Sequence, residues 1–578
     1  MPIGKIDANK AEMLRSVLNE ENTYKNCNKN NLDNCISCSY IDNPSSELCY
    51  SKKTLLKQTT RNNNFVHLND KIPNSEQQYI LNLRKAKAYT NLLTLSDDIH
   101  NQINVAFCGT GGGGKSCIAT LGFLSGAQKI TPDNDNDNSS FLNSLTYVSG
   151  LSTSAWALAL WQSSDKTLQE IKTQLRKNLN KKLFSPSSTL STKDATELIK
   201  NLVKKSLFQQ PIGHVDIYGI FGMNILFHGF FSKLNFNITD TQIKQMIRGT
   251  MAFPIYTLID PKTKRWFEVT PISTGFTDIG WIPIWALNRK FNNGSSIGFA
   301  CTTPNGTITQ QYAKEQTLGF FLGAFSSAYP LDVTNVLAKM EKINLDKAIK
   351  NDSELNKQST EFKKNYKLIV QMILRYLKKT IKSTTKTSPA TVFNYTYGIE
   401  NSPIKNDTHF ELFDGSSEFE IAIAPLLKPA RKIDIIFILD TSLNHIKPEI
   451  TELTKAFKWA KKNNKPFQDI YKYPKLGTES ITIMDENKDA PIMVYMPLIK
   501  DANLVYTDND AANFDLKTCK DCEKFNFTYT PKNFDGLWAL AEQNMILNKN
   551  VINEVLKRAS KKAIKRSWYQ GALFDTVS

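Results

Sequence analysis

The stretch that decides the fold is residues 103–116, which read Ile-Asn-Val-Ala-Phe-Cys-Gly-Thr-Gly-Gly-Gly-Gly-Lys-Ser. A short apolar run that ends in glycines and continues into helix-compatible residues predicts a strand, a tight turn and a helix. Because glycine has no Cβ, such a turn can present bare backbone N–H groups to a bound anion. The segment therefore predicts an α/β protein with an anion-binding turn at the end of a strand.

A second glycine-flanked turn follows at residues 150–154, Gly-Leu-Ser-Thr-Ser. Residues 145–148 are rich in branched and aromatic side chains and predict a buried strand, and residues 155–161 predict an apolar helix. A serine on so sharp a turn needs small neighbours two positions away, and Gly150 and Ser154 are both small. Ser152 is therefore a candidate nucleophile, although a serine that only caps a helix is the alternative interpretation.

Residues 109–116 also match the Walker A pattern of nucleotide-binding proteins. The apolar run at residues 435–440 ends in Asp440, where a magnesium-orienting aspartate is to be sought. That acid lies more than 300 residues further along the chain, and nucleotide binding leaves the turn at Ser152 unexplained. A P-loop ATPase is therefore kept as an alternative function.

A series of ordered matches resembles the catalytic domain of the cytosolic phospholipase A₂ and lysophospholipase (phospholipase B) family. Residues 110–115 resemble the family's Ser-Gly-Gly-Gly-aromatic-Arg segment, and residues 149–156 resemble its Ser-Gly-Leu-Ser-Gly-Ser-x-Trp segment. Further matches follow in order at residues 215–219, 266–271, 282–283, 291–294, 315–320, 413–415 and 459–467. The resemblance covers roughly residues 95–560, and an ordered series is more specific than any single motif.

The resemblance implies a cytosolic phospholipase/patatin-like hydrolase fold, in which a three-layer α/β arrangement has a mixed sheet flanked by helices and carries helical insertions. It also implies a serine hydrolase without a catalytic histidine. The family's serine and aspartate correspond to Ser152 and Asp414, and its oxyanion donors correspond to the backbone N–H groups of Gly112 and Gly113. Lys115 stands where the family has an arginine thought to neutralise the substrate phosphate.

Two departures from the family pattern lie side by side. Lys115 keeps the positive charge of the arginine but loses its planar, bidentate fork, so the grip on a head group is expected to be looser. Gly114 replaces an aromatic residue and removes a packing anchor. A solvated surface lysine is the alternative interpretation of Lys115, since most lysines are exposed.

A histidine-containing triad is the competing mechanism. With Asp414 as the acid, the chain order of serine, acid and histidine requires His445 among the six histidines. His445 follows a loop-like stretch with no recognisable catalytic setting, so we expect a surface or capping role for it.

The nine cysteines are an odd number, which argues against a complete disulfide framework and favours a reducing compartment. Cys35 and Cys38 together with Cys519 and Cys522 have the spacing of a zinc site. Free thiols or a local disulfide are the expected states, so we predict no metal and no cofactor.

The chain has 578 residues and a net charge of +17. This charge suits an anionic membrane surface, which attracts each nearby lysine or arginine by about 1 kcal/mol. No nucleic-acid-binding motif accompanies the charge, so nucleic acid is not expected as a partner. No apolar run approaches the ~20 residues that cross a bilayer, and the first residues lack a signal-peptide core. We expect a cytoplasmic protein that is peripheral at membranes, and export without a classical signal peptide is left open.

Residues 1–75 are predicted to form an Asn/Lys/Cys-rich N-terminal extension, and residues 76–578 a catalytic domain with a helical insertion, a lid candidate, at about 340–410. Basic amphipathic helices are predicted at residues 361–382 and 551–568. We expect both to pack on the core with a wet face, and lipid docking is the alternative.

Together these features predict a lipid acyl hydrolase that cleaves phospholipids or lysophospholipids. Ser152 attacks the acyl ester, Asp414 takes its proton, Gly112 and Gly113 bind the oxyanion, and Lys115 steadies the head group. A catalytically silent lipid-binding scaffold is the other alternative.

Overall fold

The structure is a computed structural model that describes residues 66–68, 71–95, 99, 101–132, 139–180, 191–230, 236–247, 249–302, 308–329, 334–353, 355–381, 388–442, 450–524 and 526–574. Residues 1–65, most of the predicted N-terminal extension, lie outside this range. The extension therefore stays a prediction.

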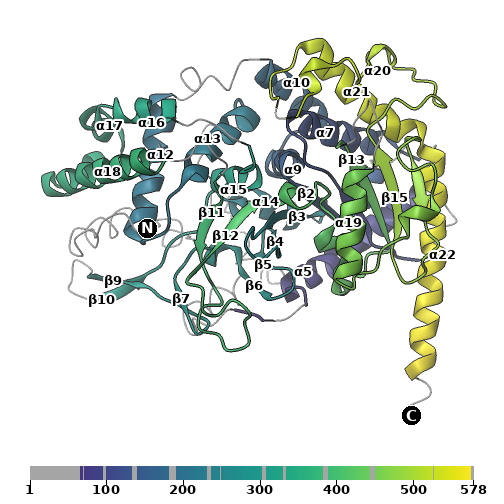
Figure 1. Ribbon diagram of the computed structural model, residues 1–578, viewed down its shortest axis with the longest axis horizontal. Coiled ribbons are helices and arrows are strands. Elements are labelled where there is room, and N and C mark those ends of the chain that lie inside the picture. The colour runs from purple at the N-terminus through teal and green to yellow at the C-terminus, as the bar shows by residue number, and fades with distance from the viewer. Residues whose placement is uncertain are drawn as a thin grey trace, which may run out of the picture.

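An 11-stranded mixed sheet forms the centre of the molecule (Figure 1). Its main path runs β14-β15-β13-β1-β2-β3-β4-β5-β6, and β12 branches from β3 and carries β11. The strands are β1 Val105–Cys108, β2 Tyr147–Leu151, β3 Phe253–Ile259, β4 Trp266–Val269, β5 Ser273–Phe276, β6 Gly280–Pro283, β11 Ala390–Phe393, β12 His409–Asp414, β13 Ile435–Asp440, β14 Thr482–Met484 and β15 Ile492–Pro497. Two small hairpins are added by β7 Phe291–Asn292 with β8 Ser295–Ser296, and by β9 Phe299–Thr302 with β10 Ile308–Gln311.

The centre of the sheet is parallel and its edges are antiparallel. Strands β15, β13, β1, β2 and β3 pair in parallel, whereas β4, β5, β6 and β12 pair antiparallel. Parallel strands are covered by helices on both faces and therefore read as continuous apolar runs, as residues 435–440 do. All six residues of β13 are buried.

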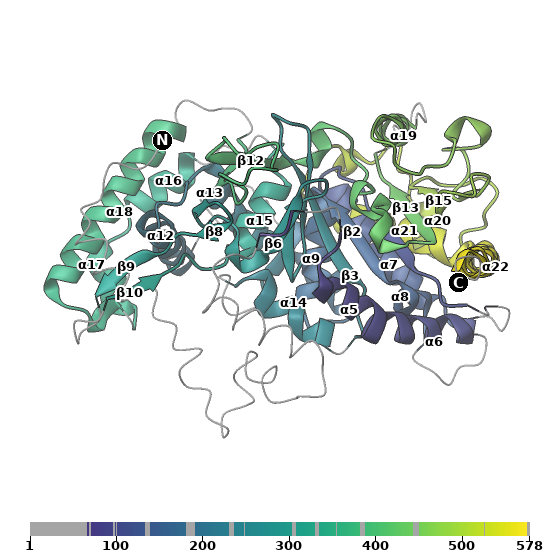
Figure 2. The ribbon, with the colours of Figure 1, turned by 90° about the horizontal axis from the view of Figure 1, so that it is seen from below.

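Helices cover both faces of the sheet, and Figure 2 shows them above and below the strands. The longer helices are α6 Lys85–Leu95, α7 Gly114–Lys129, α9 Thr153–Ser163, α10 Leu168–Leu179, α12 Thr192–Leu207, α13 His214–Phe227, α14 Ile238–Ile247, α15 Leu318–Phe325, α16 Thr334–Glu341, α18 Thr360–Ile381, α19 Thr451–Lys462, α21 Pro531–Leu547 and α22 Lys549–Phe574. Short helices are α5 Asn74–Gln78, α8 Phe141–Ser144, α17 Leu345–Asn351 and α20 Asn509–Asn513, and η2 Tyr79–Arg84 joins α5 to α6.

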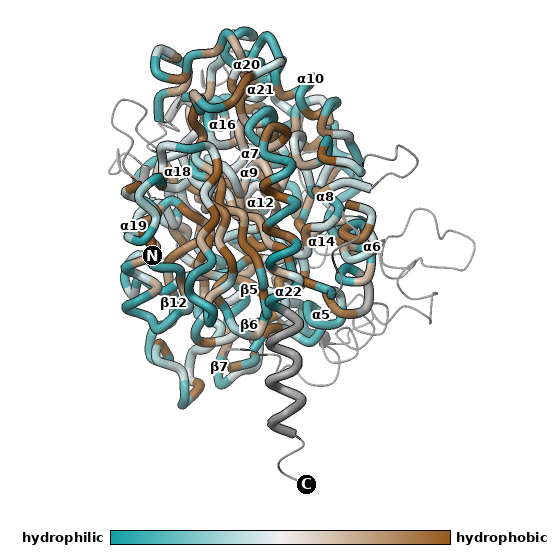
Figure 3. Tube along the Cα trace, turned by 90° about the vertical axis from the view of Figure 1, so that its right-hand side faces the viewer, coloured by the Kyte–Doolittle hydropathy of each residue, from teal (hydrophilic) through white to brown (hydrophobic). Residues whose placement is uncertain are grey.

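The strand side chains divide into two cores. In β1, Val105 and Phe107 pack into one cluster with α7, α9 and α21, whereas Ala106 and Cys108 pack into a second cluster with α19. This division follows from the two-residue period of a strand, whose side chains alternate between faces. The predicted three-layer α/β fold is confirmed, and Figure 3 shows hydrophobic segments along the central strands.

The predicted basic helices both pack on the core through their apolar faces. Helix α18 buries Phe362, Tyr366, Ile369, Ile373 and Leu377, the positions expected from the period of the pattern. Helix α22 buries Ile552, Val555, Leu556 and Ala559. Among the residues that the structure describes, no helix is long and apolar enough to cross a bilayer.

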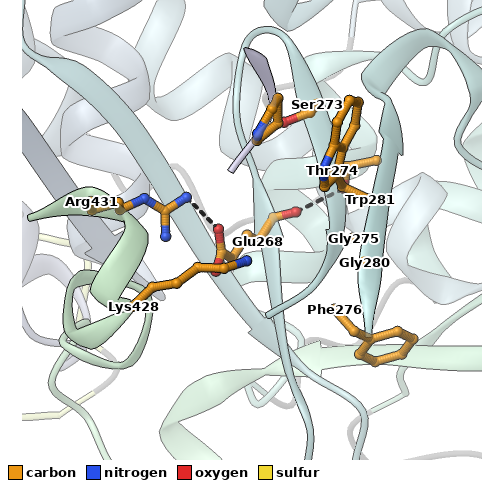
Figure 4. A pocket seen from close by; sticks show the side chains of 10 residues that line it. Glu268, Ser273, Thr274, Gly275, Phe276, Gly280, Trp281, Lys428 and Arg431 are labelled. Atoms are coloured by element: carbon orange, nitrogen blue, oxygen red, sulfur yellow. Dashed lines mark hydrogen bonds and ion pairs between the residues drawn. The ribbon is translucent and has the colours of Figure 1, made fainter. Parts of the chain in front are cut away.

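Buried ion pairs connect helix α5, the first helix after residue 73, to the sheet. Arg431 forms ion pairs with Glu76 of α5 (Nε to Oε1, 2.8 Å) and with Glu268 of β4 (Nη2 to Oε2, 2.6 Å). Arg431 and Glu268 line a small polar pocket together with Lys428 and Trp281 (Figure 4). The pocket contains neither residue of the predicted serine–aspartate pair, and we interpret its charges as the anchor that ties α5 to the sheet.

Candidate active site

Ser152 lies at the junction between β2 and α9, as the sequence predicts. Its backbone has φ 54° and ψ −124°, a left-handed conformation that is strained for a residue with a Cβ. Gly150 is required there, because a Cβ on it would lie 2.7 Å from the Cα of Ala155. Such a strand-to-helix turn holds the serine hydroxyl above the end of the sheet.

Ser154, the small residue two positions after Ser152, also holds the turn together. Its Oγ accepts from the N–H of Leu151 at 2.9 Å and donates to the Leu151 carbonyl at 2.8 Å. Its Cβ fits only because position 109 is glycine, since a Cβ on Gly109 would lie 2.7 Å away from it. The serine is therefore compatible with the turn and braces it.

Ser152 and Asp414, 262 residues apart in the chain, are in direct contact. The Oγ of Ser152 donates to Oδ2 of Asp414 at 2.8 Å, and both side chains are buried. Asp414 ends β12, where it pairs with Leu258 of β3, and β3 in turn pairs with β2 next to Ser152. The sheet therefore brings the two strand ends together.

The carboxyl of Asp414 is adapted to hold a proton near neutral pH. Burial raises its pKa to about 7, and hydrogen bonds from Ser416 and Ser152 oppose that rise. Its Oδ1 accepts from the N–H of Ser416 at 3.0 Å, and its own N–H donates to Oγ of Ser327 at 3.0 Å. A group with a pKa near 7 can act as a general base at physiological pH.

The glycine turn presents two backbone N–H groups that donate to no acceptor in the described part of the chain, those of Gly112 and Gly113. The neighbouring N–H groups of Gly111 and Gly114 are used, because they donate to the carbonyls of Glu420 at 2.9 Å and Asn526 at 3.0 Å. Gly112 and Gly113 have φ of 137° and 74°, which other residues rarely adopt.

This turn lies directly against the serine. A Cβ on Gly111 would be 3.1 Å from the Cβ of Ser152 and 3.7 Å from its Oγ. Two unused amide donors beside a serine hydroxyl form the arrangement that stabilises an oxyanion.

Lys115 is the second residue of α7 and is buried, with 8% of its surface exposed, so its interpretation as a solvated surface lysine is wrong. Burial lowers the pKa of its ammonium, while Glu420 and Asp440 act in the opposite direction. Among the described residues it makes no hydrogen bond or ion pair. The positive charge of Lys115 is therefore buried close to the carboxyls of Glu420 and Asp440.

The absence of an aromatic residue at position 114 has a structural reason. A Cβ there would lie 2.4 Å from the carbonyl oxygen of Asn526 and 2.7 Å from Cε2 of Tyr529. The C-terminal segment that contains these two residues packs directly on the turn, and it fills the space next to Gly114.

Asp440 lies much closer to the glycine turn than its place in the sequence indicates. Strand β13 pairs in parallel with β1, so Asp440 ends beside the turn and the objection based on sequence distance was wrong. Its oxygens, however, already accept from the N–H and Oγ of Ser442 and from the hydroxyl of Tyr495. The N–H of Gly114, which a P-loop would aim at phosphate, is taken by Asn526.

No described histidine forms a hydrogen bond with Ser152 or Asp414. His445, the histidine that a triad requires, lies outside the described residues. Cys519 and Cys522 form a local disulfide, one of the two expected states, and Cys35 and Cys38 also lie outside the described range. Among described residues, no cluster of three or more His, Cys, Asp or Glu side chains has the arrangement of a metal site.

Several supporting residues were not anticipated from the sequence. Ser416 had a detectable signal, because a residue two positions after an aspartate commonly donates its N–H to that carboxylate. Ser327, Glu420 and Asn526 had none, since each reaches the site only through tertiary contacts.

This chain resembles known proteins in sequence and in fold. A family model described as "Lysophospholipase catalytic domain" matches residues 103–471, more than half of the chain. Cytosolic phospholipase A2 epsilon of Mus musculus is 23% identical over 544 residues, which cover 83% of this chain and 58% of that protein. The chain thus spans less than two thirds of this relative.

Solved structures share the fold. "Human GIVD cytosolic phospholipase A2" superposes with a TM-score of 0.62 at 16% identity, covering 86% of this chain and 68% of that one. The same human protein in complex with methyl gamma-linolenyl fluorophosphonate gives a TM-score of 0.60 at 18% identity, covering 86% and 66%.

Proposed function

This chain belongs to the lysophospholipase catalytic domain family, and on that premise we propose that it is a lipid acyl hydrolase that cleaves carboxylic esters of phospholipids or lysophospholipids. The observation that carries the proposal is the contact between Ser152 Oγ and Asp414 Oδ2, 2.8 Å long and next to two unused glycine amides. Neither a Ser-only N-cap nor a nucleotide site accounts for that combination.

The proposed reaction begins when Ser152 Oγ attacks the ester carbonyl and Asp414 accepts the hydroxyl proton. The carbonyl oxygen becomes an oxyanion that accepts from the N–H groups of Gly112 and Gly113, each such donor being worth about 3 kcal/mol of transition-state stabilisation. The alcohol then leaves with the proton from Asp414. Water opens the acyl-enzyme by the same steps, and Asp414 takes the proton of that water.

In this reaction Lys115 is proposed to act on the substrate head group as a buried positive charge. Because its ammonium is enclosed, it favours a nearby phosphate through the local field more than through direct, directional bonds. Burial lowers the pKa of the ammonium, and the proximity of Glu420 and Asp440 opposes that lowering.

Contact with an anionic membrane surface is proposed through the outward face of α18. The exposed positions of that face follow one stripe, which begins with Glu361 and continues through Lys364, Leu368, Gln371, Arg375 and Lys379. The cations on its flanks, Lys367 and Lys378, are instead paired with acids of neighbouring helices. A cationic stripe with one exposed leucine suits anionic head groups. We propose a cytoplasmic protein that binds membranes peripherally, with the helical insertion at about 340–410 as the lid candidate.

The function is tested with purified protein on vesicles that contain diacyl phospholipid and lysophospholipid, with the fatty acids released analysed by mass spectrometry. The hydrolase requires release by the wild type and none by Ser152→Ala. Hydrolysis of ATP that persists in Ser152→Ala and is lost in Lys115→Ala would instead support the nucleotide-binding alternative. Binding of lipid without any release would support the silent scaffold.

The membrane contact is tested by vesicle sedimentation. Reversal of the stripe in the variant Lys364→Glu, Arg375→Glu, Lys379→Glu is expected to weaken binding to anionic vesicles at least tenfold. The matched control reverses three exposed lysines of α19, Lys458→Glu, Lys461→Glu, Lys462→Glu, with the same change in net charge. Equal losses of vesicle binding in both variants would mean that binding depends on the net charge of the protein and not on the α18 stripe.

A further inference from the structure

The C-terminal segment that covers the glycine turn, residues 519–530 apart from 525, is held firmly in place. The Cys519–Cys522 disulfide closes its first turn, and the N–H of Tyr529 donates to the carbonyl of Leu179 at 2.9 Å. The carboxylate of Asp521 accepts from the N–H and the hydroxyl of Thr530. The segment therefore fixes whatever side chains it carries at the active site.

One of these side chains is Lys524, whose ammonium forms an ion pair with the carboxylate of Glu420. Glu420 is the residue whose carbonyl accepts from the N–H of Gly111, and Gly111 lies against Ser152. Lys524 is thus linked to the nucleophile through only two intervening residues. Asp414 also contributes to the electrostatic environment of Lys524.

The two cations near the site differ in their access to solvent. The side chain of Lys524 is 57% exposed, whereas that of Glu420 is 8% exposed and Lys115 is buried. A charged phosphate loses much hydration when it enters a protein interior, so it is met more easily by a cation at the surface. Of Lys115 and Lys524, only the second satisfies that condition.

The acids around the site make such a cation necessary. Glu420, Glu452, Asp440 and Asp414 lie close enough to influence one another or the two lysines. A substrate phosphate that approaches Ser152 would meet this negative field unless a cation screened it. Because the side chain of Lys524 is largely exposed, it can turn from Glu420 toward a phosphate, and the buried carboxylate that it leaves then needs another positive charge nearby.

We propose that Lys524 is the residue that binds the phosphate of the substrate directly, by exchanging its ion pair with Glu420 for one with the phosphate, whereas Lys115 acts on it only through the field of a buried charge. The carboxylate of Glu420 then lies near the positive charge of Lys115. Each negative group, the carboxylate and the phosphate, therefore has a cation close to it. The assignment rests on the proposed ester hydrolysis and adds a determinant of specificity for phosphorylated substrates.

The test compares two substrates with the same acyl chain, a lysophosphatidylcholine and a monoacylglycerol that has no phosphate. Lys524→Gln is expected to lower kcat/KM for the lysophospholipid at least tenfold, mainly through KM, and to leave the monoacylglycerol within twofold. Lys524→Arg, which keeps the charge, is expected to recover most of the loss. The matched control is Lys455→Gln, an exposed lysine paired with Glu452 of the same acidic group.

A second measurement uses sn-glycerol 3-phosphate as a competitive inhibitor, whose inhibition constant is expected to rise at least tenfold in Lys524→Gln. Equal losses on both substrates would overturn the proposal, because they would mean that Lys524 only supports the glycine turn. An unchanged inhibition constant would also overturn it. A wild-type protein that hydrolyses neither ester would overturn the proposed function itself, and this assignment with it.

Discussion

Two acids at the ends of strands in the same sheet, Asp414 of β12 and Asp440 of β13, are alike in their local structure. Each is the last residue of its strand, is buried, and accepts the N–H of the serine two positions later, at 3.0 Å for Ser416 and 2.8 Å for Ser442. Burial raises the pKa of both carboxyls.

They differ in the partner of the second oxygen. Oδ2 of Asp414 accepts from Ser152, which sits on a strained turn beside unused amides, whereas Oδ2 of Asp440 accepts from Tyr495 in the middle of a buried strand. A hydroxyl on a strained turn can approach a substrate, and a tyrosine in the core cannot. The same Asp-x-Ser turn can therefore support catalysis or only stabilise the core, depending on which hydroxyl the second carboxylate oxygen accepts from.

Substituting each acid by its amide tests most directly whether Asp414, and not Asp440, takes part in catalysis. Asp414→Asn and Ser152→Ala are expected to lower kcat/KM for a lysophospholipid by about 10⁴-fold or more, because each removes a member of the dyad. Asp440→Asn is expected to stay within about tenfold. A larger loss in Asp440→Asn than in Asp414→Asn would contradict the assignment of the two acids.

Asp414→Asn is also expected to stabilise the fold against unfolding. Burial raises the folded-state pKa of Asp414 from its ordinary value near 4 to about 7, so the wild type loses stability as pH rises from about 4 to about 7. Asp414→Asn avoids that loss and is expected to gain up to about 4 kcal/mol of unfolding free energy at pH 8. The gain should shrink at pH 5 and vanish near pH 4.

Urea unfolding of the two proteins at pH 8 and pH 5 measures this difference. Asp440→Asn should change in the same direction, because burial raises that pKa too. A gain that is independent of pH would show that the carboxyl of Asp414 is not the source.

The glycine donors allow a sharper test of what surrounds Ser152. Gly113→Ala is expected to lower kcat by about 10²- to 10³-fold, because φ of 74° is strained for alanine and the amide donor shifts. Gly477→Ala, which also places alanine at a positive φ, 82°, serves as the control for backbone strain. Equal kcat values for the two variants would mean that the amide of Gly113 does not stabilise the oxyanion.

The smallest effect is the pH dependence of the wild type. Because Asp414 must be deprotonated to accept the serine proton, kcat/KM is expected to fall about tenfold per unit below a midpoint near pH 7. Asp440→Asn should leave that midpoint in place. A profile that is flat from pH 5 to pH 8 would mean that another group accepts the proton.

Local pattern predicted the elements that position the site. The apolar runs at residues 103–108 and 435–440 are strands β1 and β13, and the junction at Ser152 is a strand-to-helix turn. Such elements can be predicted because strand burial and turn strain are recorded in the residues themselves. The burial of Lys115 could not be predicted, since nothing near it in the chain reveals that residues 526–529 pack on the adjacent Gly114.

The sequence by itself determined the α/β class, the two glycine turns and, through ordered matches to a known family, which serine and aspartate to compare. Only the tertiary structure decided that Asp414 meets Ser152 while Asp440 meets Tyr495, and that Lys524 reaches the glycine turn from the far end of the chain. The physical reason is that sheet order joins strands hundreds of residues apart. Which strand ends become neighbours depends on the packing of the whole core, and no local pattern encodes it.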